Sequence, residues 1–192
     1  MRRGVVLILL CLGVGSLFAR SDSTWHVDIG YSGGNIVHPG LTAGAYRVVK
    51  RKPLNRANGK VMAKDLLLGA RLGFYFHKDY QTAFWLQGEL ARKKMKSRGR
   101  SRTISLGLGG IETWIPNSYL VDQNGSIDYR SGKGIAYFLL SPSIEWAKEI
   151  SNYQGFISEW YVRPRIQWQF PYFQGTNQYL LIEMGVKLRG SK

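Results

Sequence analysis

The sequence has a single cysteine, Cys11, among its 192 residues. Cys11 lies inside an apolar stretch, residues 4–15, that we expect to be removed with a signal peptide. The remaining chain would then contain no disulfide and no thiolate-dependent metal or catalytic site. Its stability must come from side-chain packing and backbone hydrogen bonds.

Long apolar runs are also missing. After residue 19, no segment has the roughly 20 consecutive apolar residues that a membrane-spanning helix needs, which excludes a helical membrane protein. Acidic residues are scarce as well, because 12 Asp and Glu stand against 27 Lys and Arg and give a formal net charge of +15. Such an excess favours nucleic acid or an anionic membrane surface as a partner.

The N-terminus is typical of an export signal. Arg2 and Arg3 precede the apolar stretch, and Ala19 is a small residue suited to cleavage. We predict a signal peptide over residues 1–19 and a single domain over residues 20–192. Loss of the two arginines would lower the net charge from +15 by 2, to +13.

The rest of the chain alternates apolar and polar residues with a period of two, which is the period of a β-strand. Eight stretches show this pattern, at about 25–31, 41–50, 65–77, 84–90, 103–114, 136–146, 155–170 and 180–189. In the second stretch the phase slips near Ala45 and Tyr46, which predicts a β-bulge there. We predict an all-β fold, a closed up-and-down antiparallel transmembrane barrel of about eight strands.

The clearest alternation runs from Trp160 to Phe170. Its even positions are all apolar, whereas its odd positions carry Tyr, Arg and Gln. Trp160 and Trp168 are eight residues apart, which is about 26 Å along a strand. A tilt of about 40° reduces this to a height of about 20 Å, close to the apolar band of about 25 Å on membrane barrels. We predict that the apolar face contacts lipid and that Arg163 and Arg165 point into the barrel.

The same alternation along the chain predicts two larger sets of residues. Charges of both signs on the polar faces predict an interior network, because an unpaired buried charge costs several kcal/mol. Its predicted members are Arg71, Glu89, Glu145, Glu159, Arg163, Arg165, Glu183 and Lys187. Glu145, Glu159 and Glu183 are the predicted partners of the two arginines on the seventh stretch. Aromatic residues near strand ends on the apolar faces predict lipid-interface belts. Their predicted members are Trp25, Tyr31, Phe74, Phe76, Trp114, Trp146, Trp160 and Trp168.

Two features interrupt the strand rhythm. The longest link, Pro116–Gly134, has Asn124-Gly125 at its centre, which predicts a small hairpin inside the link. Pro142 and Pro164 lie within strand patterns, where each removes one ladder hydrogen bond. We predict irregular strand pairing at these two prolines.

The pattern of strands resembles the small eight-stranded outer-membrane β-barrel proteins, the class that includes the OmpA, OmpX and OmpW types. The resemblance covers the whole mature chain as a pattern, and no motif assigns a subfamily. It implies an outer-membrane location, contact with outer-membrane lipid, and a structural or surface-interaction role. The last strand of that class ends in an aromatic residue, whereas Leu188 stands at that place here.

A basic run separates the fourth and fifth stretches, and we interpret it as a link between strands. Its cations are Arg92, Lys93, Lys94, Lys96, Arg98, Arg100 and Arg102. They predict contact with anionic headgroups or a periplasmic polyanion, with a solvated hairpin tip as the simpler interpretation. Nucleic acid is disfavoured as a partner, because the run has no interleaved aromatic residues for base stacking. A second basic link is predicted over residues 51–60.

The candidate chemistry is sparse. His26 and Asp28 have the minimal spacing of metal ligands on one strand face, but no His follows His77 and no Ser–His pairing can be read. We expect no catalytic, cofactor or metal site. Three hypotheses stay open. The preferred one is a non-enzymatic outer-membrane barrel with a structural or surface-interaction role, including a narrow conduit or a binder of a small apolar ligand. The others are a soluble exported lipocalin-like barrel and a barrel-embedded lipid-modifying enzyme.

Overall fold

The structure is a computed structural model. It describes residues 25–34, 38–55, 61–76, 82–96, 98–114, 118–121, 124–130, 134–150, 156–172 and 175–188. The signal peptide predicted over residues 1–19 lies outside the described residues. Within the described part of the chain, no helix is long and apolar enough to cross a membrane.

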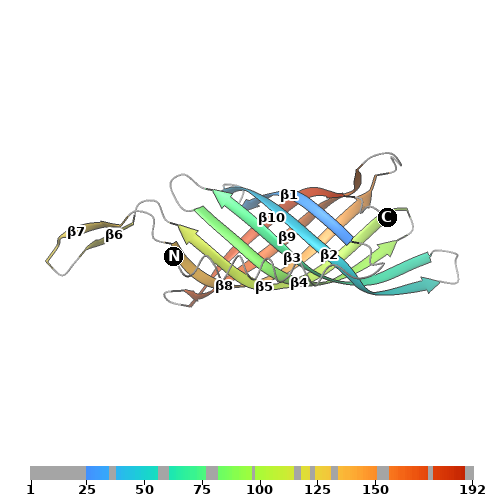
Figure 1. The fold of residues 1–192 in the computed structure, drawn as a ribbon, viewed down its shortest axis with the longest axis horizontal. Coiled ribbons are helices and arrows are strands. Elements are labelled where there is room, and N and C mark those ends of the chain that lie inside the picture. Colours follow the sequence, from blue (N-terminus) through green and yellow to red (C-terminus); the bar gives the residue numbers. More distant parts are fainter. Residues whose placement is uncertain are drawn as a thin grey trace.

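Eight long antiparallel strands form a closed ring in the order β1-β10-β9-β8-β5-β4-β3-β2 (Figure 1). The ring strands are β1 (Trp25–Gly34), β2 (His38–Asn55), β3 (Val61–Phe76), β4 (Thr82–Lys96), β5 (Arg100–Trp114), β8 (Gly134–Glu149), β9 (Ile157–Tyr172) and β10 (Gly175–Leu188). Each pairs with its neighbours along the chain, and β1 pairs with β10 to close the ring. The predicted all-β, up-and-down arrangement of eight strands is confirmed.

The predicted small hairpin is also confirmed. Strands β6 (Ser118–Val121) and β7 (Ile127–Arg130) form a separate two-stranded antiparallel sheet inside the link between β5 and β8. Gly125 in its turn has a φ of 76°, which glycine adopts without the steric penalty of a Cβ atom. The hairpin projects from one end of the ring (Figure 1).

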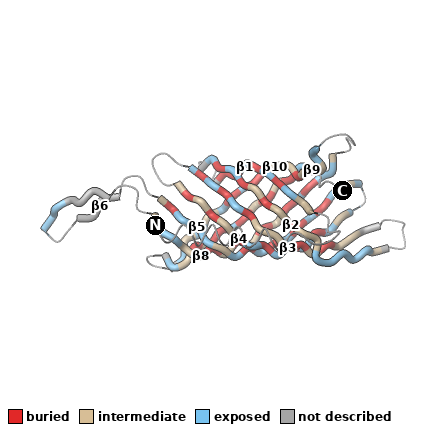
Figure 2. The backbone as a smooth tube through the Cα atoms, in the orientation of Figure 1, coloured by how far each residue is buried: buried red, intermediate tan, exposed pale blue. Residues whose placement is uncertain are grey.

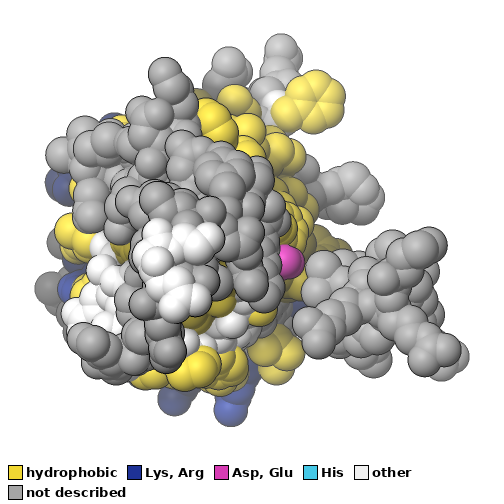
Figure 3. All heavy atoms as spheres, turned by 90° about the vertical axis from the view of Figure 1, so that its left-hand side faces the viewer, with side chains coloured by type: hydrophobic (Ala, Val, Ile, Leu, Met, Phe, Trp, Pro, Cys, Tyr) yellow, Lys and Arg dark blue, Asp and Glu magenta, His cyan; other side chains and the backbone are white. Residues whose placement is uncertain are grey.

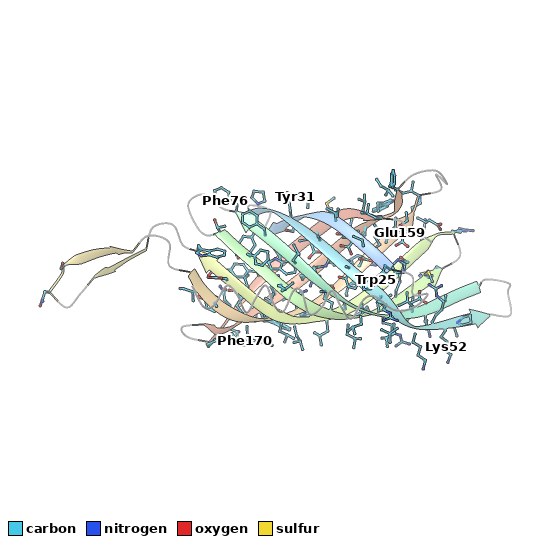
Figure 4. All side chains as sticks on the ribbon, viewed as in Figure 1. Trp25, Tyr31, Lys52, Phe76, Glu159 and Phe170 are labelled. Carbon is cyan, nitrogen blue, oxygen red and sulfur yellow. The ribbon has the colours of Figure 1, made fainter. Side chains whose placement is uncertain are left out.

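The two ends of the ring differ, and we name them by what they carry. The hairpin end carries β6 and β7, together with Tyr31, Phe76 and Phe170 (Figure 4). The terminal end carries the start of β1 at Trp25 and the end of β10 at Leu188, which lie near each other because Val27 pairs with Leu188. At the terminal end, β2 and β3 extend beyond the other strands (Figure 1).

Burial alternates along the ring strands as the sequence period requires (Figure 2). On β9, the odd positions from Tyr161 to Gln169 are buried and the even positions are exposed or half-buried. The buried side chains point into the interior of the ring, which we call the lumen. Arg163 and Arg165 are among them, at 4% and 1% relative exposure.

Two of the predicted links between strands are wrong, because the strands continue into them. The predicted link 51–60 is strand up to Asn55, because β2 and β3 stay paired beyond the ring through Lys52 and Lys64. The basic run after Arg92 is not a loop, since β4 continues to Lys96 and β5 begins at Arg100. Charged exposed residues can extend a hairpin where its two strands already pair, and apolar periodicity does not detect such extensions.

The β-bulge predicted near Ala45 and Tyr46 is found further along β2. The register of β2 against β3 shifts between Val48 and Lys50 instead. Tyr46 breaks the apolar–polar pattern because it is an aromatic side chain that points into the lumen, where it is 5% exposed. The sequence signal near Tyr46 therefore came from a lumen aromatic residue and not from an irregular backbone.

The irregular pairing predicted at the two strand prolines is confirmed between β8 and β9. Leu140 pairs with Trp168 and Ser143 pairs with Arg165, but no pair lies between them. Pro142 falls in this gap, and Pro164 falls in the next one, before Trp146 pairs with Val162. Proline has no N–H to donate, so a ladder is interrupted where it faces the neighbouring strand.

Candidate functional site

The candidate site is a charged network in the middle and terminal half of the lumen. All eight predicted network members lie at inward positions, and seven of them are buried to 6% relative exposure or less. Glu159, the eighth, is half-buried at the terminal end. Two further charged residues belong to the network: Asp28 and Lys93, each at 2% exposure. Sequence alternation placed Asp28 on the polar face of the first stretch, but its role was not predicted.

Arg71 on β3 is the centre of the network. It forms ion pairs with Asp28 on β1 and with Glu183 on β10, where the Nη1–Oε2 distance is 3.2 Å. Its Nε donates to the hydroxyl oxygen of Tyr46 at 3.0 Å. That hydroxyl in turn donates to Oε2 of Glu89 at 2.5 Å. One guanidinium on β3 is thus linked to side chains on four other strands of the ring, β1, β2, β4 and β10.

The two arginines of β9 complete the central layer. Arg163 forms ion pairs with Glu145 and with Glu183, the latter at 3.1 Å. Arg165 donates from Nε to Oε1 of Glu183 at 2.7 Å. Its Nη2 forms an ion pair with Oε1 of Glu89, also at 2.7 Å. Two of the three predicted acidic partners, Glu145 and Glu183, are therefore confirmed.

The third predicted partner, Glu159, binds lysines instead. It pairs with Lys93 at 2.5 Å and with Lys187 at 3.3 Å. Lys187 also reaches Glu145 at 2.5 Å. Glu159 lies two inward positions nearer the terminal end than Arg163, so it meets the lysines of β4 and β10 rather than the arginine layer.

The charges inside the lumen balance. The cations are Arg71, Lys93, Arg163, Arg165 and Lys187, and the carboxylates are Asp28, Glu89, Glu145, Glu159 and Glu183. These five positive and five negative groups give a formal charge of zero, and a further inward carboxylate, Asp65 at 1% exposure, is paired with Arg51. Balance is what a narrow lumen requires, because each buried charge without a partner is strongly destabilising.

Aromatic side chains fill the space around these charges. Arg163 lies over the ring of Tyr161, with its guanidinium carbon 4.8 Å from the centroid, and Arg165 lies 5.6 Å from the centroid of Trp85. Such contacts add cation–π attraction to the ion pairs. Trp85 shares the polar face of its stretch with Gln87 and Glu89, whereas the lumen role of Tyr46 was not predicted.

An apolar cluster lies in the lumen on the hairpin side of the charged network. It consists of Tyr75, Ala83, Trp85, Ile111 and Leu139, all at 4% exposure or less. On the terminal side, a recess lined in part by His26, Lys93 and Lys187 has a volume of about 20 Å³, which is room for about one water molecule. Buried apolar and charged side chains thus lie one above the other in the described part of the lumen.

The outer face carries the eight aromatic residues that were predicted to form lipid-interface belts. All eight predicted residues lie at outward positions. Tyr31, Phe74, Phe76, Trp146 and Trp160 are exposed, whereas Trp25, Trp114 and Trp168 are half-buried. Trp25, Trp146 and Trp160 lie toward the terminal end and the other five toward the hairpin end. Figure 3 shows hydrophobic side chains around the flank of the ring, viewed from the hairpin end.

The seven cations of the predicted basic run do not all share one environment, because successive side chains of a strand point to opposite faces. Arg92, Lys94, Lys96, Arg98, Arg100 and Arg102 are exposed. Lys93 is an exception and a correction, because it points into the lumen and pairs with Glu159. Arg51 on β2 is a further basic residue at the terminal end. Its Nε donates to Oδ1 of Asp65 at 3.0 Å, and its Nη2 donates to Oδ2 at 2.9 Å. This bidentate hydrogen bond raises the pKa of Arg51.

No family model matches the chain, and no curated protein matches it.

Proposed function

We propose that the chain is an integral outer-membrane β-barrel with a closed lumen, and that its role is structural or surface-interacting rather than enzymatic. The observation that carries the proposal is the inverted arrangement of side chains. Every ring strand presents exposed large apolar residues outward, among them Ile29, Leu72, Leu106, Ile166 and Ile182. A membrane barrel has this distribution, with apolar side chains toward lipid and polar ones inside.

The charged lumen supports this proposal over a soluble ligand-binding barrel. A lipocalin-like protein that holds an apolar molecule needs an apolar lumen, whereas here five ion-paired cations and five carboxylates occupy it. A soluble protein also rarely exposes a contiguous apolar surface beyond a few hundred Å². On this chain the apolar outer face continues around all eight strands of the ring.

The buried side chains in the lumen argue for a structural or surface-interaction role rather than diffusion of solutes. An eight-stranded barrel is just wide enough for side chains to fill. Here the apolar cluster around Trp85 and the arginine layer at Arg163 are stacked along the lumen. The projecting β6–β7 hairpin is the element best placed to meet a partner outside the membrane (Figure 1).

The native tryptophans allow a direct test. The chain has six Trp; Trp146 is outward and 49% exposed, whereas Trp85 is inward and 1% exposed. Two single-tryptophan variants, each keeping one of these residues and replacing the other five by Phe, are reconstituted into vesicles with brominated acyl chains. We expect strong quenching of Trp146 and little quenching of Trp85.

Equal quenching of both tryptophans, or a protein that stays soluble without lipid or detergent, would contradict the membrane proposal. The unaltered protein provides a control that does not depend on the Phe substitutions. It should resist extraction by carbonate and should migrate differently on a gel before and after heating.

A further inference from the structure

The excess positive charge of this chain lies outside the lumen. Because the lumen charges sum to zero, they contribute nothing to the formal net charge of +15. A large part of the excess gathers on one part of the outer surface, toward the terminal end. We call these residues the basic collar. They are Lys50, Lys52, Lys64, Arg92, Lys94, Lys96, Arg100, Arg102 and Lys148.

Strand register aligns the collar into rows. Lys52 pairs with Lys64, Lys64 with Lys94, and Lys94 with Arg102, so one row crosses four strands, β2 to β5. Directly opposite residues share a face and have Cβ atoms about 4.5–5.5 Å apart. Lys50 and Arg92 belong to a neighbouring row, since both pair across to Leu66.

A further row lies closer to the terminal rim. Lys96 pairs with Arg100, and Arg100 pairs with Lys148 on β8. Like charges placed directly opposite destabilise a sheet. Among the residues that the structure describes, no ion pair involves a collar side chain. The rows therefore favour anions supplied from outside the chain.

The collar continues directly into the apolar outer face. One step toward the hairpin end along each strand, Arg92 is followed by Leu90, Arg102 by Ile104 and Lys148 by Trp146, all exposed. The row through Arg102 also continues sideways to Trp146, which pairs with it. Figure 4 shows Lys52 at the terminal end, away from the rim that carries Tyr31 and Phe76. In a membrane, this boundary between apolar and basic side chains is the headgroup level.

We infer that the basic collar binds the phosphates of anionic phospholipids, in the leaflet at the end of the ring where β1 begins and β10 ends. The inference rests on the proposed membrane insertion. Long Lys and Arg side chains reach the interface while their stems cover apolar surface. A basic side chain near an anionic membrane surface contributes about 1 kcal/mol. Lipid headgroups fit better than a soluble polyanion, because the collar lies on the outer wall of β2 to β5 and β8, next to the lipid-facing residues.

Binding of defined phospholipids tests the inference. The full barrel in a neutral detergent is titrated with phosphatidylglycerol and, separately, with phosphatidylcholine, and bound lipids are resolved by native mass spectrometry. We expect tighter binding of phosphatidylglycerol. The variant Lys94→Gln/Arg102→Gln should weaken phosphatidylglycerol binding by about 25-fold, since it removes two charges and about 1 kcal/mol per charge corresponds to about fivefold for each.

A matched variant separates charge from side-chain shape. Lys94→Arg/Arg102→Lys keeps both charges on the same two paired positions and should keep the preference for phosphatidylglycerol. Equal binding of the two lipids, or an unchanged preference in the double Gln variant, would overturn the inference. Inositol hexakisphosphate that binds at the collar and displaces phosphatidylglycerol would also overturn it and would assign the collar to a soluble polyanion.

Failure of the inference can be distinguished from failure of the membrane proposal. If Trp146 is quenched in vesicles of phosphatidylcholine alone, the barrel inserts, and an absent preference for phosphatidylglycerol then rejects the collar inference only. If Trp146 is not quenched in any vesicle, the membrane proposal fails and the inference fails with it.

Discussion

Arg71 and Glu183 form an ion pair across the lumen, with Nη1 of the arginine 3.2 Å from Oε2 of the glutamate. They are 112 residues apart in the chain, and β1 and β2 separate their strands in the ring. Only a narrow closed ring brings two such side chains together. The pair therefore links the folding of the first half of the chain to that of the second.

Removal of Arg71 should strongly destabilise the protein. Arg71→Met keeps most of the side-chain volume but leaves Asp28 and Glu183 with one partner fewer in a buried site. We expect a loss of about 3–5 kcal/mol in the free energy of unfolding, the range for breaking a buried ion pair. Denaturant unfolding in phosphatidylcholine vesicles measures it. Arg92→Met, at an exposed outward position, is the control and should stay within about 0.5 kcal/mol.

The ion pair between Arg163 and Glu145 should be energetically coupled. In a double-mutant cycle of Arg163→Gln and Glu145→Gln, we expect a coupling energy of about 0.5–3 kcal/mol, because each single change leaves the other charge without this partner. As a reference, Arg163→Gln is combined with Asp65→Asn, whose carboxylate binds Arg51 instead. That pair should be additive within about 0.5 kcal/mol. Additivity in both cycles would argue against a cooperative network.

The energetic effect of a charge on the outer face should depend on its depth in the membrane. Leu106 is 48% exposed in the middle of the outward face of β5, whereas Ala136 is exposed close to the hairpin rim of β8. Leu106→Arg should destabilise the protein in vesicles by about 2–4 kcal/mol and Ala136→Arg by about 0–1 kcal/mol. Unfolding in phosphatidylcholine vesicles compares the two. Similar values for both would be inconsistent with a lipid-facing apolar band.

Gly109 and Gly110 are neighbours on β5. Substitution by alanine should lower the stability of the protein at Gly109 but not at Gly110. A Cβ at Gly109 would overlap the backbone oxygen of Leu86, whereas a Cβ at Gly110 would have its nearest atom, the carbonyl oxygen of Tyr137, at 3.7 Å. Gly109→Ala should cost about 1–3 kcal/mol from overpacking. Gly110→Ala should be neutral or stabilise by up to about 1 kcal/mol through the unfolded state. Thermal unfolding of the two variants side by side measures both.

The sequence alone determined the strands and their faces. Period-two alternation placed Arg163, Arg165 and Glu183 on one face and Trp160 and Ile166 on the other, because successive side chains of any strand point to opposite sides. It also set the number of ring strands, since each apolar–polar stretch became one strand. These properties are local, so they can be read without knowing which strands are neighbours.

Only the tertiary structure decided which charges meet. Glu159 and Glu145 share the predicted polar faces, yet Glu159 binds Lys93 and Glu145 binds Arg163. Register between strands sets the height of each side chain in the lumen, and register depends on ring closure rather than on local alternation. Continuation of β4 through the basic run placed Lys93 in the lumen, and the register aligned Lys94 with Arg102 on the outer wall. Alternation thus separated the two faces of each strand, whereas closure of the ring and its stagger decided which face is inside and which charges are partners.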